Sequence, residues 1–218
     1  SILPELCSFL NGNKKIVRIV SDNDLSEQKF INTLKKSYSL NFSNLYTIDL
    51  PNGFSELIDK KPSFGKYSNV YMLSICENQE ILDSFVDLEI FGDAKLAGEL
   101  LGYPKCCLKN FDNISSLGSK WSLFYVDDFK RNNTAYYNCN RFPIFFNSIS
   151  PVGELFPCSL SCKNAKKYSL NMIKDMEYFG YSELVSKMIE ISKKTIYIDS
   201  HGAFSLVKKP NSSKIFFK

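Results

Sequence analysis

Three short runs of residues that favour β-strands mark the first eighty positions of the chain. The runs at residues 15–20, 44–50 and 70–75 end in turn-forming residues or lead into helical periodicity, so they predict three β-strands. Between the first two runs, apolar residues recur at helical spacing over residues 26–36. The order strand, helix, strand, strand predicts a small α/β unit over residues 1–80.

The period changes to that of a helix over residues 79–101, in two pieces separated near Gly92. Asp93 is a suitable N-cap for the second piece, and Gly102 stands where a glycine commonly ends a helix. Pro104 follows at a position where a new helix can begin. We therefore expect two helices and then a sharp corner into a third.

Helical periodicity returns after Pro157 and is interrupted near Gly180, which predicts two further helices. Residues 195–198 and 203–207 flank a turn and predict a β-hairpin. The fold class expected is therefore α+β, with an N-terminal α/β unit over residues 1–80. A mostly helical domain, closed by the hairpin, is expected over residues 81–218.

Two cysteine motifs stand at the predicted helix starts. They read Gly102-Tyr103-Pro104-Lys105-Cys106-Cys107 and Phe156-Pro157-Cys158-Ser159-Leu160-Ser161-Cys162. We expect each proline to lead directly into the first turn of a helix. The N–H groups and the helix dipole at such a terminus favour the thiolate form, which binds metals and attacks electrophiles.

The spacing of these cysteines suggests how many can reach one metal ion. Cys158 and Cys162 are four apart, so on a helix they would share one face. Cys106 and Cys107 are adjacent and would point about 100° apart on a helix. We therefore expect three thiolates at the site, which leaves a coordination position open. An iron–sulfur cluster with one accessible iron is the favoured cofactor, and zinc is the second.

Other interpretations of the four cysteines stay open. They could form a closed zinc site that fastens two helices together, or they could be metal-free thiols that act as a redox pair or are simply buried. Cys7 and Cys76 lie in apolar stretches and are expected to be small buried residues. The role of Cys139 is ambiguous.

Several polar residues could line a pocket beside the cysteines. Arg141 is the favoured catalytic candidate because the chain has only three arginines, although it could simply pair with a surface carboxylate. His201, the single histidine, could be a ligand or a proton shuttle, but its hairpin turn favours an exposed residue. Asn164 is expected to point away from Cys162 on a helix. The remaining candidates are Asp127, Asp128, Asn140 and Glu154, of which Asp128 is the preferred catalytic one.

Composition narrows the classes of function. The chain has 218 residues, of which 44% are hydrophobic and 23% charged, as in ordinary globular proteins. It carries no apolar run of about 18 residues and no recognisable signal peptide, so we expect no membrane association and a cytoplasmic location. The net charge is +4, but the lysines are scattered and arginines are few, so specific nucleic-acid binding is not expected.

The first predicted strand is followed by an acidic turn and not by the glycines of a phosphate-binding loop. The N-terminal unit is therefore expected to be a scaffold or a surface for a protein partner.

The two cysteine motifs, with Ala165 three residues after the second, resemble those of a family of mostly uncharacterised proteins. Its members carry Gly-Tyr-Pro-x-Cys-Cys and, about fifty residues later, Pro-Cys-Ser-x-x-Cys, and they occur in archaea and in bacterial modification or biosynthetic gene clusters. The resemblance covers roughly residues 94–207. A histidine often stands two residues before the second proline in that family, whereas this chain has Leu155 there.

Together, these observations predict a cytoplasmic metal-dependent enzyme with an open three- or four-cysteine site. Its substrate would be a small molecule, or a group bound to a carrier or peptide, in a biosynthetic or modification pathway. The alternative is a non-catalytic, zinc-stapled interaction module of a larger biosynthetic or RNA-modifying complex.

Overall fold

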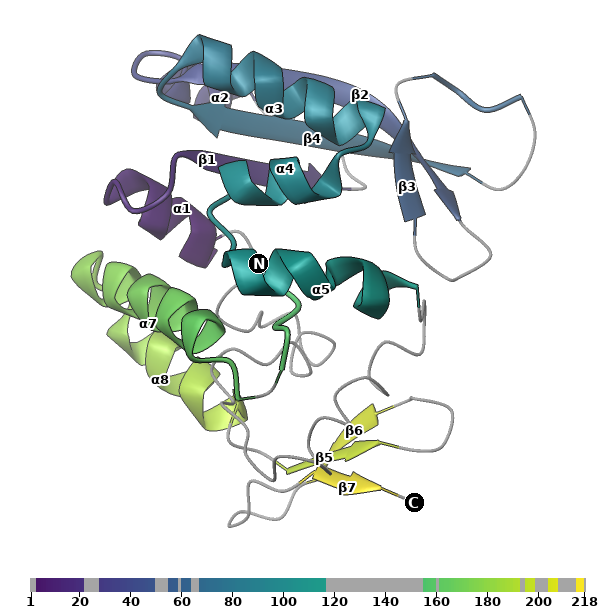
Figure 1. Cartoon of the computed structure of the whole chain (residues 1–218). Coiled ribbons are helices and arrows are strands. Elements are labelled where there is room, and N and C mark those ends of the chain that lie inside the picture. The colour runs from purple at the N-terminus through teal and green to yellow at the C-terminus, as the bar shows by residue number, and fades with distance from the viewer. Residues whose placement is uncertain are drawn as a thin grey trace. The chain divides into compact units, whose positions relative to one another are not determined.

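The computed structural model describes residues 3–21, 28–49, 55–58, 60–63, 67–116, 155–159, 161–192, 195–198, 204–207 and 215–217. The chain divides into two compact units (Figure 1). One unit contains Gly12–Gly102, and the other combines Leu3–Asn11 with the chain from Tyr103 onward. The predicted division into a scaffold or partner-binding unit over residues 1–80 and a cysteine-site domain over residues 81–218 stays a prediction.

The unit of residues 12–102 is built on an antiparallel sheet with strand order β1-β4-β2-β3. The predicted strands at 15–20, 44–50 and 70–75 are confirmed, and each is part of a longer or shifted strand. Strand β3 is only four residues long and is not among the strands that the sequence predicts. The bounds are β1 Ile16–Ser21, helix α2 Gln28–Leu34, β2 Ser39–Asp49, β3 Ser55–Ile58 and β4 Tyr67–Cys76.

The predicted pair of helices after the sheet is confirmed as α3 (Gln79–Phe91) and α4 (Ala94–Leu100). Gly92 ends α3 with a φ of 98°, a left-handed conformation that disfavours residues with a Cβ atom. The carboxylate of Asp93 then accepts hydrogen bonds from the first N–H groups of α4, as expected of an N-cap. Local capping chemistry therefore explains where these two helices begin and end.

Helix α3 packs against β2 and β4 and buries its apolar face there. Leu82 and Phe85, three positions apart on that face, are completely buried. At the far end of the helix, Glu89 forms an ion pair with Arg18 of β1. The sheet and α3 thus form a hydrophobic core within this unit.

The other unit contains helices α1 (Leu3–Leu10), α7 (Lys163–Tyr178) and α8 (Ser182–Ser192). Helix α7 packs against both of the others. Their shared core consists of Cys7, Met172, Ile173, Met176, Val185 and Met188. Helix α1 has only two turns and is not among the helices that the sequence predicts.

The same unit contains α5 (Lys105–Ser115) and a small sheet of β5 (Thr195–Ile198), β6 (Phe204–Val207) and β7 (Ile215–Phe217). Strands β5 and β6 pair in antiparallel fashion, which confirms the predicted hairpin, and β7 joins β5 in parallel. The fold class is α+β, as the sequence indicated. Within the described residues, every helix is too short or too polar to cross a membrane.

We predict that Phe85→Ala will lower the free energy of unfolding by about 3–5 kcal/mol, because it leaves a cavity in the core under α3. Phe91→Ala is the matched control in the same helix, since the Phe91 side chain is 78% exposed. The control should change stability by less than about 0.5 kcal/mol. Urea denaturation followed by circular dichroism would measure both values, and similar losses would contradict this description of the core.

Candidate metal centre

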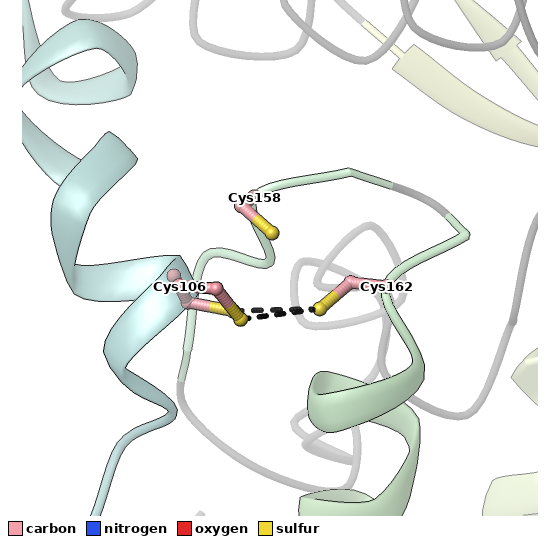
Figure 2. A group of neighbouring side chains, drawn as sticks. Cys106, Cys158 and Cys162 are labelled. Atoms are coloured by element: carbon pink, nitrogen blue, oxygen red, sulfur yellow. Dashed lines mark hydrogen bonds between the residues drawn. The ribbon is translucent and has the colours of Figure 1, made fainter.

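Four cysteines from two distant parts of the chain converge in the unit that contains α5 and α7. Cys106 and Cys107 lie in the first turn of α5, Cys158 lies in the loop before α7, and Cys162 is the N-cap of α7. Figure 2 shows the side chains of Cys106, Cys158 and Cys162 pointing toward one another. All four sulfur atoms lie within 4.8 Å of one another, so these cysteines could hold a metal ion.

The individual distances show how tightly the sulfurs are grouped. The sulfur of Cys162 lies 3.7 Å from that of Cys106 and 3.9 Å from that of Cys107. The sulfurs of Cys106 and Cys107 are 4.0 Å apart. The expectation that only one of these neighbours could reach the site is therefore wrong. Their Cα–Cβ bonds diverge by about 100° on the helix, yet both sulfurs lie within 4.0 Å of the sulfur of Cys162.

The first motif begins helix α5 and presents this pair in its first turn. Gly102 has a φ of 78°, which a glycine adopts without strain, and it separates α4 from the next segment. Pro104 is the N-cap of α5 and not its first helical residue. The N–H groups of Cys107 and Leu108 both donate to the carbonyl oxygen of Pro104, at 2.8 and 3.1 Å. The predicted helix start is thus confirmed to within one residue.

The second motif differs from the prediction. The residues around Pro157 and Cys158 are not helical, and α7 begins only at Lys163. Cys162 caps that helix, because its sulfur accepts a hydrogen bond from the N–H of Ala165 at 3.4 Å. Cys158 and Cys162 therefore do not share a helix face. The loop between them brings Cys158 back toward the other sulfurs.

One side of the cysteine group rests against apolar residues. Cys107 and Cys162 are buried together with Leu155 and Ala165. Leu155 is only 4% exposed. It occupies the position at which the family that the motifs resemble often has a histidine, and its side chain cannot bind a metal. Cys106 and Cys158 are half-buried. The group therefore has a dry side and a side that water reaches.

Tyrosines connect the group to neighbouring helices. The ring of Tyr168 packs edge-on against that of Tyr103, with centroids 5.8 Å apart, and both rings border the cysteines. The hydroxyl of Tyr168 donates to the carboxylate of Glu5 in α1 at 3.3 Å. Helix α7 is thereby held against both α1 and the segment that leads into α5.

Asn164 contributes a contact that the sequence analysis did not anticipate. Its side-chain N–H donates to the sulfur of Cys106 at 3.4 Å. Helical spacing predicts that Asn164, two residues after Cys162, is turned away from that cysteine. It instead reaches across to the cysteine pair of α5, and only the pairing of the two segments could reveal this contact.

The family model described as "Protein of unknown function (DUF483)" matches residues 70–191, more than half of the chain. The chain belongs to this family. The predicted resemblance to an uncharacterised cysteine-motif family is therefore confirmed. The matched residues begin and end earlier in the chain than the expected range of 94–207. It includes all four converging cysteines. No curated protein and no solved structure matches the chain.

The remaining predicted residues of this DUF483 member fall into two groups. Cys7 and Cys76 are buried, as expected, and neither belongs to the metal-binding group. The other candidates lie outside the described residues: Asp127, Asp128, Cys139, Asn140, Arg141, Glu154 and His201. Their proposed roles stay predictions.

Crowding of the sulfurs separates the pKa values of Cys107, Cys158 and Cys162 in the metal-free DUF483 chain. The hydrogen bond that Cys107 donates lowers the pKa of Cys158 to about 6. The same bond, together with burial, raises the pKa of Cys107 well above its usual value. Burial raises the pKa of Cys162 to about 11. At neutral pH, Cys158 is therefore a thiolate, while Cys107 and Cys162 keep their protons.

We predict that iodoacetamide will alkylate Cys158 faster than Cys107 or Cys162 in reduced, metal-free protein at pH 7, because the thiolate is the nucleophile. The rate at Cys158 should fall about tenfold per pH unit below its pKa of about 6. Peptide mass spectrometry over pH 5–8 would measure each cysteine separately. Equal rates at the three positions would contradict the assigned pKa order.

Proposed function

We propose that Cys106, Cys107, Cys158 and Cys162 bind one zinc ion in a closed centre, and that the protein is a zinc-stapled interaction module of a larger biosynthetic or modification complex. The convergence of the four sulfurs within 4.8 Å is the observation that carries this proposal. It departs from the iron–sulfur cofactor that the sequence favoured, and the reason is the spacing of the sulfurs.

A single tetrahedral zinc ion fits this spacing. Zinc–thiolate bonds of about 2.3 Å place the sulfurs of a tetrahedral site about 3.8 Å apart. The three sulfur–sulfur distances among Cys106, Cys107 and Cys162 are 3.7, 3.9 and 4.0 Å. A cubane cluster binds each cysteine through a different iron, which would separate the sulfurs by roughly 6 Å. The spacing therefore favours one ion over a cluster.

The number of ligands favours a structural role. Zinc sites with four protein ligands have no position left for water or substrate, whereas catalytic sites keep one open. Cys106 and Cys162 are 56 residues apart in the chain, so a shared ion would fasten the start of α5 to the start of α7. Metal binding that closes such a long loop contributes directly to the free energy of folding.

An enzyme remains the second candidate function, supported by the partial exposure of Cys106 and Cys158. If one of these thiolates left the metal, the centre would gain an open position for a substrate. An iron–sulfur cluster bound there would supply a Lewis-acidic iron. The substrate would be a small molecule or a carrier-bound or peptide-bound group. Arg141, Asp128 and His201 are the proposed catalytic residues of this alternative.

The partner and the compartment are part of the proposal. A protein partner would bind the N-terminal sheet unit, because the sequence after its first strand carries no phosphate-binding motif. Specific nucleic-acid binding and membrane association are not proposed. The cytoplasm is the proposed location, because its reducing conditions keep thiols available to a metal.

We predict that protein purified without oxygen will contain one zinc ion per chain and no acid-labile sulfide. Removal of the zinc by a chelator should lower thermal stability, because the bound ion stabilises only the folded state. Metal analysis and thermal denaturation would measure both effects. Brown protein with iron and labile sulfide would instead support the enzyme alternative, and metal-free protein with unchanged stability would exclude both.

We predict that a serine substitution at any of the four cysteines will weaken zinc binding by more than about a hundredfold. Removing a group that only hydrogen-bonds to a metal ligand already lowers metal affinity by roughly 10–100-fold. Cys106→Ser and Cys107→Ser should cause similar losses. Cys7→Ala and Cys76→Ala are the controls and should keep full zinc content, because both cysteines lie outside the group. Zinc-chelator competition would measure the affinities. A variant that retains wild-type affinity would remove that cysteine from the ligand set.

A further inference from the structure

We propose that Asn164 is a positioning residue of the zinc centre: it holds the Cys106 thiolate on the metal and protects that thiolate from electrophiles. The inference rests on the proposed zinc centre and adds a residue that is not itself a ligand. Its basis is the hydrogen bond from the side-chain N–H of Asn164 to the sulfur of Cys106, at 3.4 Å.

The charge of the centre explains why such donors matter. One zinc ion and four thiolates leave a net charge of about −2 on a group of five atoms. Part of that group lies against the buried side chains of Leu155 and Ala165, which cannot solvate an anion. N–H groups directed at the sulfurs withdraw charge from them and make each thiolate a weaker nucleophile.

The donors differ from one sulfur to the next. Cys162 receives the main-chain N–H of Ala165 at 3.4 Å. Cys106 receives its N–H from a side chain, that of Asn164. Main-chain donors persist whatever the residue type, but a side-chain donor can be removed by one substitution. The hydrogen bond to the sulfur of Cys106 therefore depends on the residue type at position 164.

Cys106 is more exposed than Cys107, so the hydrogen bond from Asn164 acts on the more accessible thiolate of the pair. Cys107 is 3% exposed, so electrophiles cannot approach its sulfur, whereas Cys106 is half-buried. Asn164 is itself exposed and lies beside the sulfur that water reaches. The hydrogen bond therefore acts on a thiolate that could otherwise be attacked or could leave the metal.

A second asparagine supplies the matched control. The side chain of Asn110 donates to the main-chain carbonyl oxygen of Cys106 at 3.3 Å and does not contact the sulfur through that bond. Asn164→Ala and Asn110→Ala therefore delete equivalent amides that bond different atoms of one cysteine. Asn164→Asp keeps the shape of the side chain, removes the donor and adds repulsion.

The test uses the full chain loaded with zinc. In Asn164→Ala we expect iodoacetamide to alkylate Cys106 about tenfold faster, and zinc to pass to a competing chelator about tenfold faster. Asn164→Asp should exceed both effects, and Asn110→Ala should match wild type. Mass spectrometry of the Cys106 peptide and chelator absorbance would measure the rates, and circular dichroism would confirm that each variant is folded.

The outcomes separate this inference from the zinc proposal. Wild-type protein that binds no zinc would overturn both. Wild-type protein that binds zinc, while Asn164→Ala keeps wild-type rates, would overturn the role of Asn164 alone. Equal effects of Asn164→Ala and Asn110→Ala would also overturn it, because the cause would then be the stability of α5 and not the bond to sulfur.

Discussion

Mutual repulsion between thiolates is the constraint on which the centre of this protein depends. Four sulfurs within 4.8 Å cannot all be ionised unless a cation lies between them. In the metal-free chain the protons stay on Cys107 and Cys162, whose pKa values are raised, and the pKa of Cys158 is lowered. A metal ion would replace those protons, so metal binding, protonation and the joining of α5 to α7 are one coupled equilibrium.

Local features of the chain place the sulfurs where this equilibrium can operate. Gly102 turns the chain, Pro104 starts α5, and Cys162 serves both as a helix cap and as a member of the cysteine group. The apolar contacts of Leu155 and Ala165 exclude water from one side, which strengthens every charge interaction there. The sheet unit, with its core under α3, does not need the metal centre in order to bury its own apolar surface.

Elements with strong local signals were predictable. Helices α3 and α4 could be located because Gly92 and Asp93 interrupt a clear helical period, and β1 and β4 because their runs are rich in β-branched and apolar residues. Helix α1 and strand β3 were missed because two turns or four residues carry too little periodicity. The sequence places the start of α7 too early, because Pro157 and Cys158 resemble a first helical turn but lie before the helix, which begins at Lys163.

The amino-acid sequence by itself determined the chemistry that is available: two cysteine motifs, their family and the α+β class. It did not determine how many sulfurs meet or where Cys158 lies, and it did not reveal that Asn164 contacts Cys106. Those features depend on side-chain torsions and on the path of a loop. They are set by contacts between segments more than fifty residues apart in the chain, and no local sequence pattern reveals such contacts.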